Sequence, residues 1–78
     1  MDAMIKIPIS DDDAETRGNI GNLVLSLREE NGYLAKQLTS VTIPHLCRIE
    51  RGRVYPRLDT FLRLLDELGA SLWIHTDD

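Results

Sequence analysis

The side chains best suited to chemistry in this chain are a group of arginines near its middle: Arg48, Arg51, Arg53 and Arg57. They surround a short apolar pattern, Leu46 and Ile49, that predicts an amphipathic helix ending at Gly52, with a basic loop after it. A guanidinium offers a planar fork of N–H donors that matches a phosphate group or the edge of a guanine base. Arginines on a helix flank and in the adjoining loop therefore indicate double-stranded DNA as the first partner to consider.

The charge distribution makes this basic group stand out. The 78-residue chain has a formal net charge of -4, and seven of its 13 acidic residues lie near the two ends: Asp2, Asp11, Asp12, Asp13, Glu15, Asp77 and Asp78. A basic patch in an acidic protein argues against a general nucleic-acid coat and favours a local binding surface. The run of aspartates at 11–13 is most simply a solvated helix cap; a second interpretation makes it attractive to a basic surface on a protein partner.

Other kinds of chemistry find little support. Cys47 is the only cysteine, so the chain has neither an intrachain disulfide nor, with His45, the four ligands of a structural zinc site. We find no Gly-rich phosphate loop, no paired carboxylates in an apolar setting and no nucleophile motif. No apolar run approaches the roughly 20 residues that span a bilayer, and no signal peptide is visible. We expect a cytoplasmic binding protein that is not an enzyme and needs no cofactor or metal.

Helical spacing of apolar residues predicts four short helices that would position the arginines. They should cover residues 10–31, 33–40, 42–52 and 58–69. The aspartates cap the first helix, Thr42 caps the third with Pro44 in its first turn, and Gly69 ends the fourth. The second helix has only a short apolar pattern.

Two segments outside the helices have the alternation of strands. Residues 4–9 read as an edge strand, because Pro8 forbids a central one, or equally as a tethered arm. Residues 71–76 alternate as well, and they should pair with the N-terminal segment, with a second subunit, or with both. Trp73 is either a cover for the core or an interface anchor. The chain thus divides into an arm (1–13), a helical domain (14–69) and a strand with an acidic tail (70–78).

This order of elements resembles the helix-turn-helix domain of the phage-repressor-like (XRE) family. The resemblance covers about Asn19 to Gly69 and is most specific at Leu46-x-x-Ile49-Glu50-Arg51-Gly52 and Pro56-x-Leu58-x-Thr60-Phe61-Leu62. The segment Leu68-Gly69-Ala70-Ser71-Leu72-Trp73-Ile74 looks more narrowly like the HipB antitoxins. The resemblance implies a mostly α, four-to-five-helix repressor-like domain whose C-terminal strand pairs across a homodimer.

The same resemblance implies a function and a set of site residues. A HipB-like protein represses its own toxin-antitoxin operon in the bacterial cytoplasm, is nucleoid-associated when bound to operator DNA, and neutralises a HipA-like serine/threonine kinase toxin. The matching positions for base reading are Pro44, His45 and Arg48. Those for phosphate contact are Arg51, Arg53, Tyr55, Arg57, Lys36 and Gln37. Arg28 and Glu50 match a structural ion pair, and the dimer interface would use Leu72, Trp73 and Ile74.

One departure from the family pattern affects the functional prediction. Between Leu38 and Leu46 the chain has about three fewer residues than the usual helix-turn-helix spacing, and an alternative register places the shortage in the second helix. A shortened helix or turn changes how the domain docks on DNA, or abolishes DNA binding while the fold persists. Two functions therefore stay open: a repressor that reads DNA itself, and a protein-interaction subunit that neutralises a toxin and binds DNA weakly or only in complex.

Overall fold

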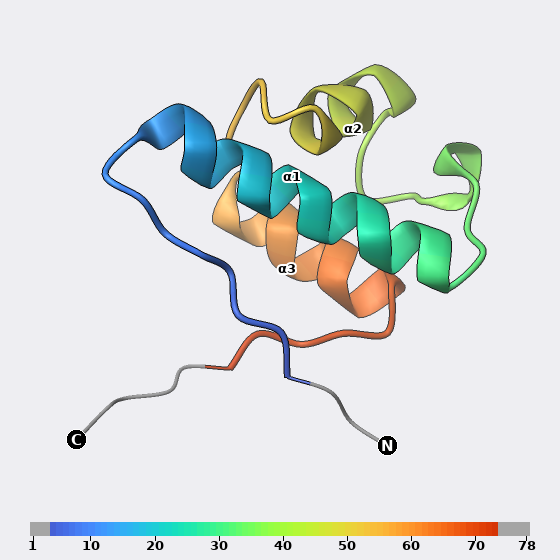
Figure 1. Cartoon of the computed structure of the whole chain (residues 1–78). Helices are drawn as coiled ribbons and strands as arrows, with labels where there is room; N and C mark the ends of the chain where they lie inside the picture. Colours follow the sequence, from blue (N-terminus) through green and yellow to red (C-terminus); the bar gives the residue numbers. More distant parts are fainter. Residues whose placement is uncertain (1–3, 74–78) are drawn as a thin grey trace.

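The computed structural model describes residues 4–73, and most of this part of the chain is helical. In chain order the elements are α1 (Asp13–Glu30), the short 3₁₀ turn η1 (Ala35–Gln37), α2 (Ile43–Glu50) and α3 (Leu58–Glu67). In Figure 1, α2 lies above α1, and α3 lies behind α1. The predicted mostly helical fold class is confirmed, and the three α-helices occupy the positions of the predicted first, third and fourth helices.

The helices enclose one small apolar core. Helix α1 contributes one buried apolar side chain, α2 two, α3 with its C-cap four, and the connection before α2 one, to give Val24, Leu38, Leu46, Ile49, Phe61, Leu64, Leu65 and Leu68. Burial of each such side chain contributes about 1.5–3 kcal/mol relative to leaving it exposed, which is the main force that holds α2 and α3 together with α1. The core therefore fixes where the outward faces of these helices point.

The start of α1 confirms the aspartate run as a helix cap. The Asp12 carboxylate accepts a hydrogen bond from the backbone N–H of Ala14 (2.9 Å), and Asp13 and Glu15 put negative charge in the first turn. The buried Thr16 hydroxyl ties this turn to Ser10, accepting from its N–H (3.0 Å) and donating to its carbonyl oxygen (3.1 Å). The N-terminal segment is thus joined to the helix that follows it.

The predicted helix at 33–40 is wrong in extent, since only the 3₁₀ turn η1 forms there. After η1 the chain becomes extended at Leu38, whose side chain is buried in the core. The following Thr39 and Ser40 direct their backbone N–H groups to the Glu67 carboxylate of α3 rather than into another helical turn. Side-chain acceptors that capture backbone donors in this way compete with helix formation. Residues 4–73 accordingly contain three α-helices rather than four or five.

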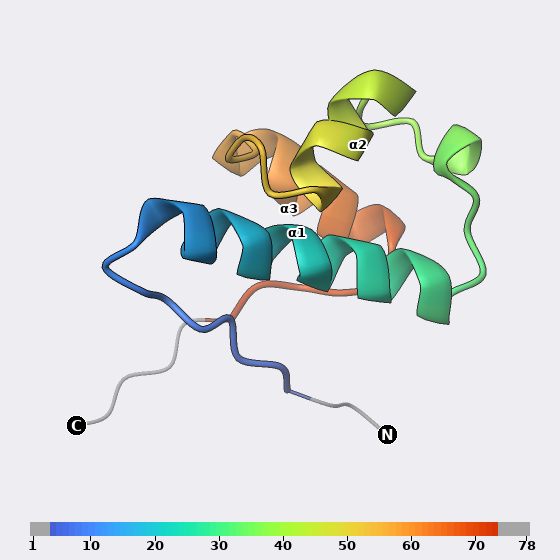
Figure 2. The same cartoon turned by 45° about the horizontal axis from the view of Figure 1, so that its top comes forward.

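No strand forms within residues 4–73, so the edge strand at 4–9 is absent, and Ser71, Leu72 and Trp73 lie in irregular chain. A strand needs a backbone ladder, and the two terminal segments pass near each other in Figures 1 and 2 without one. The N-terminal segment corresponds to the tethered arm: Ile7 packs against the core, and Asn19 Nδ2 donates to the Pro8 carbonyl oxygen (2.8 Å).

The C-terminal segment leaves its large apolar residues accessible. Trp73 is 78% exposed and therefore does not cover the core; its indole N–H donates to the Ser71 hydroxyl (2.7 Å). Leu72 is also exposed. The rest of the predicted dimerisation strand, including Ile74 and the acidic tail, lies outside the described residues. Across residues 4–73, none of the helices has the length and apolar character needed to cross a bilayer.

Candidate nucleic-acid interface

The short helix α2 presents two opposite faces. Its N-terminus is capped by Thr42, whose hydroxyl accepts from the His45 N–H (3.4 Å), and Pro44 occupies the first turn. Leu46 and Ile49 are completely buried on one side. At about 100° per residue, the exposed residues Pro44, Arg48 and Arg51 fall in line on the other side, and we call them the outer stripe. The predicted base-reading residues Pro44 and Arg48 are therefore brought together on a solvent-facing surface.

His45 does not join the outer stripe. One residue on from Pro44, it lies about 100° around the helix and four residues before Ile49, so it borders the buried face. Its side chain is half-buried accordingly. The structure thus places His45 at the edge of the outer stripe: it lies beside Arg48, about 60° from it around the helix, and is less accessible than Arg48.

Glycine ends α2 and turns the chain into the basic loop. Gly52 has φ +71°, a left-handed conformation that side chains with a Cβ rarely adopt. The N–H of Arg53 reaches back to the carbonyl oxygen of Arg48 (2.9 Å), as expected when a left-handed residue caps a helix. Residues 51–57, which we call the arginine loop, then run to the start of α3. The predicted phosphate contacts on this loop are all exposed: Arg51, Arg53, Tyr55 and Arg57.

The C-terminal end of α2 rests directly on α1 at Gly21. A Cβ at this position would lie 2.3 Å from the carbonyl oxygen of Ile49 and 2.8 Å from that of Glu50. Such distances are far below van der Waals contact, so only glycine lets the two backbones approach this closely. Gly21 therefore determines how closely α2 packs on α1, and so where the outer stripe lies relative to the rest of the domain.

The predicted ion pair lies next to this contact. Arg28 of α1 donates to both carboxylate oxygens of Glu50, from Nε at 2.7 Å and from Nη2 at 3.0 Å, and its Nη1 donates to the Tyr33 carbonyl oxygen (3.2 Å). Both side chains are mostly shielded from solvent, with 18% and 9% exposed. The hydrogen bond with Glu50 raises the pKa of Arg28 above its usual value. This two-pronged geometry fixes the end of α2 in rotation as well as in position.

The arginine loop packs against the N-terminal half of α1, a contact that was not predicted from the sequence. The Arg17 guanidinium lies over the Tyr55 ring, 5.6 Å from its centre, and its Nε donates to the Gly52 carbonyl oxygen (3.3 Å). The Tyr55 hydroxyl donates to the backbone and carboxylate oxygens of Asp13 (both 3.3 Å). Reduced solvation, and then the negative charge of Asp13, raise the pKa of Tyr55. The four-residue spacing of Asp13, Arg17 and Gly21 was the available signal, because it puts all three on one face of the helix.

Glu67 was also missed, and it holds the turn that precedes α2. Its carboxylate accepts from the N–H of Thr39 (2.9 and 3.1 Å), from the N–H of Ser40 (2.7 Å) and from both hydroxyls. Burial acts to raise the pKa of Glu67, but these hydrogen bonds outweigh it and hold the pKa below its usual value. One carboxylate thus fixes the turn that precedes α2.

The remaining predicted phosphate contacts lie in η1. Lys36 and Gln37 are both exposed. The Gln37 side-chain oxygen is already occupied, since it accepts from the N–H of Leu34 (2.7 Å). A three-residue turn has no helical N-terminus to lay on a phosphate, so contact there would rest on side-chain donors: the Lys36 ammonium and the Gln37 amide N–H groups.

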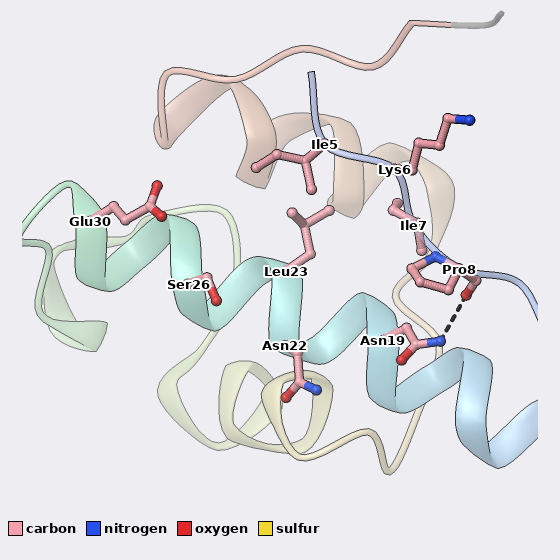
Figure 3. Close-up of a pocket in the computed structure, with 9 residues that line it drawn as sticks. All are labelled: Ile5, Lys6, Ile7, Pro8, Asn19, Asn22, Leu23, Ser26 and Glu30. Atoms are coloured by element: carbon pink, nitrogen blue, oxygen red, sulfur yellow. Dashed lines mark hydrogen bonds between the residues drawn. The ribbon is translucent and has the colours of Figure 1, made fainter. Parts of the chain in front are cut away.

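A second surface feature lies across α1 from α2. An open groove of about 340 Å³ separates the N-terminal segment from α1 (Figure 3). Its walls mix apolar and polar side chains, namely Ile5, Lys6, Ile7, Pro8, Asn19, Asn22, Leu23, Ser26 and Glu30. Within residues 4–73 no three His, Cys, Asp or Glu side chains cluster closely enough to hold a metal ion. The exposed arginines of α2 and its loop therefore remain the candidate site.

Three α-helices, with α2 packed on α1 after a connection that contains η1, fit a small helix-turn-helix domain. The chain is similar to a protein of Haemophilus influenzae that carries the name uncharacterized HTH-type transcriptional regulator: they are 39% identical over 54 residues. The match covers 65% of this chain and 55% of that protein, so the chain spans about half the length of the curated relative it matches. No protein-family model matches the chain, and no solved structure does. The similarity agrees with the helix-turn-helix class and does not resolve the XRE family or the HipB-like antitoxins within it.

Proposed function

We propose that this chain is a sequence-specific DNA-binding transcriptional regulator that uses α2 as its reading helix. The observation that carries the proposal is the outer stripe: Arg48 and Arg51 face solvent opposite the buried side of α2, and the arginine loop follows directly. This basic surface exists in a chain of net charge -4. The similarity to a protein named an HTH-type transcriptional regulator supports the same function.

The roles follow from the geometry of B-form DNA. The major groove admits an α-helix, and a guanidinium on its outer face can bind O6 and N7 of guanine together, so Arg48 is the base-reading residue. Arg53 and Arg57 extend from the loop and bind phosphate, which sets register without reading sequence. The chain acts as a homodimer on a palindrome with half-sites about one helical turn apart. Exposed Leu72 and Trp73 support this, because they leave apolar surface for a second subunit to cover.

The finer proposal makes this regulator the antitoxin of a type II toxin-antitoxin operon. It would repress its own operon and neutralise a HipA-like serine/threonine kinase. The support is the resemblance of residues 68–74 to the HipB antitoxins, stated above from sequence. The test is co-expression with the product of the neighbouring gene: relief of toxicity and a co-purifying complex are expected, and continued toxicity would remove the antitoxin role.

A specific observation favours a second candidate function. The reduction of the second helix to η1 removes the helix N-terminus that would rest on phosphate. In this alternative the chain is mainly a protein-interaction subunit that neutralises a toxin and binds DNA weakly or only with its partner. It predicts that binding to operator DNA appears only after the partner is added.

A DNA titration distinguishes the two candidates. Purified protein is titrated against the DNA upstream of its own gene at two salt concentrations, with scrambled DNA as competitor. A regulator that acts alone gives specific retardation that weakens steeply with salt, since each phosphate contact adds about -0.9 to the slope of log K against log salt. No retardation by the chain alone, but retardation with its partner, would establish the alternative.

Two arginine variants test the assignment within the interface. Arg48→Ala should lose about 1–3 kcal/mol of discrimination between operator and scrambled DNA. Arg53→Ala should weaken both DNAs equally and lower the salt slope by about 1. Arg63→Ala is the charge-matched control, because Arg63 is exposed on α3. Equal behaviour of the Arg48 and Arg53 variants would contradict the placement of α2 in the groove.

A further inference from the structure

We propose that Arg17 is a positioning residue that holds the arginine loop in place for phosphate binding, and this rests on the proposed DNA-binding function. Arg17 belongs to α1, outside the helix-turn-helix signature, and touches the loop at two points. Its Nε donates to the Gly52 carbonyl oxygen (3.3 Å), and its guanidinium covers the Tyr55 ring at 5.6 Å from the centre. These contacts bracket Arg53, so both ends of the segment that carries this arginine are attached to α1.

Two further contacts, one on each side of Arg17 along α1, also hold the arginine loop against this helix. One turn before it, Asp13 accepts from the Tyr55 hydroxyl (3.3 Å). One residue after it, Gly18 lies so close to the loop that a Cβ on Gly52 would be 2.8 Å from the Gly18 Cα. The loop therefore rests on one face of α1 at residues 13, 17 and 18, and Arg17 supplies the contact at its middle.

This arrangement has a direct consequence for DNA binding. Arg51 and Arg53 are exposed, so the path of the loop backbone determines where their guanidinium groups start, whereas Arg57 at the end of the loop also pairs with Asp59 of α3 (3.4 Å). A loop held in one conformation loses less conformational entropy when its arginines bind phosphate. Loss of Arg17 should weaken binding to all DNA sequences alike, because phosphate contacts carry no sequence information.

Limited trypsin digestion tests the loop restraint without DNA. Cleavage after Arg51 or Arg53 reports loop opening, whereas cleavage after Arg28 in α1 or Arg63 in α3 reports opening of the helices. In Arg17→Ala the rate of loop cleavage should rise about tenfold, as expected for one hydrogen bond and one cation–π contact, while cleavage in the helices stays near the wild-type rate. Arg63→Ala is the matched control for net charge and should leave the loop rate unchanged.

The comparison of Arg17→Lys with Arg17→Ala separates geometry from charge. Lysine keeps the positive charge but lacks the planar fork that stacks on Tyr55 while binding Gly52. We expect Arg17→Lys to retain much of the loop opening, and DNA affinity to fall about threefold to tenfold in the alanine variant with the operator preference intact. Full recovery of loop protection and affinity by lysine would overturn the proposal, since charge alone would then suffice.

The loop restraint by Arg17 and the proposed DNA-binding function are overturned by different results. Unchanged loop cleavage in Arg17→Ala overturns the positioning role whatever the DNA titration shows. Faster loop cleavage in a protein whose wild type binds no DNA supports the loop restraint and removes the proposed function instead. Faster cleavage together with uniformly weaker DNA binding supports both.

Discussion

The contact between Gly21 and the end of α2 leads to a prediction that can be worked out in magnitude. Gly21→Ala would place a methyl group 2.3 Å from the Ile49 carbonyl oxygen and 2.8 Å from that of Glu50. Ordinary contact requires at least 3.4 Å, so the backbones must separate by about 1 Å. Because both obstacles are backbone oxygens, no rotamer change relieves the clash.

The energetic terms have opposite signs. Alanine gains about 1 kcal/mol over glycine in a helix interior. Overpacking costs typically 1–3 kcal/mol, and here the shift also disturbs Leu46 and Ile49, which are completely buried, and the bidentate Arg28–Glu50 pair. The gain from alanine reduces an overpacking cost of about 3 kcal/mol to about 2, and weakening of the charged hydrogen bonds in the pair, each worth about 1.5–3 kcal/mol when intact, adds to it. We expect a net loss of about 2–3 kcal/mol in the free energy of unfolding, which corresponds to a fall in Tm of about 8–24 °C for a domain of this size.

Gly18→Ala provides a matched control in the same helix. A Cβ at Gly18 meets no heavy atom within 4 Å, so only the gain in helix propensity applies. This variant should be more stable than the wild type by about 0.5–1 kcal/mol. Urea unfolding followed by circular dichroism at 222 nm measures both variants under one condition. If Gly21→Ala proves as stable as Gly18→Ala, then α2 does not rest on α1 at this point, and the derived position of the outer stripe is wrong.

Further predictions concern the charged contacts. Glu67→Gln should lower the free energy of unfolding by about 1–2 kcal/mol at pH 7. Because the pKa of Glu67 is lowered in the folded state, the advantage of the wild type is present above the ordinary value of 4.5 and disappears as pH falls through the lower folded-state value. Urea unfolding midpoints of both proteins at pH 7 and pH 3 check this. An advantage that persists at the lower pH would rule out the carboxylate as its source. Arg28→Ala and Glu50→Ala should show a coupling energy of about 1–3 kcal/mol in a double-mutant cycle, and additive losses would refute the ion pair.

The elements that could be predicted from sequence are those with strong local signals. Each of the three α-helices has a cap or a stop, and its apolar residues recur at helical spacing, so its position follows from contacts within a few residues. The short apolar pattern at 33–40 could not reveal how the segment folds, because that depends on Glu67, which lies 28 residues after Thr39. The edge strand at 4–9 was predicted from alternation alone, which specifies a face to bury but not a ladder partner.

The candidate site likewise contains residues whose positions follow from local sequence signals and others whose positions do not. Exposure of Arg48 and Arg51 follows from the helical repeat once Leu46 and Ile49 are known to be buried. That His45 borders the buried face of α2, three residues before Arg48, follows in the same way only once this burial is known. The contact between Tyr55 and Asp13 spans 42 residues and has no local signature. Gly21 did give a signal, because glycine inside a helical pattern often marks a close approach.

The same contacts explain why a missing second helix need not leave α2 unsupported. Its C-terminal end is fixed by Gly21 and the Arg28–Glu50 pair, and the turn before it is held by Glu67. What the short η1 removes is the helix N-terminus that would contact phosphate, and it leaves only the exposed side chains of Lys36 and Gln37 there. If one or two contacts per subunit are lost, the salt slope flattens by about 1–2 per subunit, and affinity falls with it. A chain with a well-held reading helix but few phosphate contacts would then depend on a second subunit or a toxin partner to add binding surface. The two proposed functions therefore differ in the number of phosphate contacts more than in the fold, and the measured salt slope is the quantity that separates them.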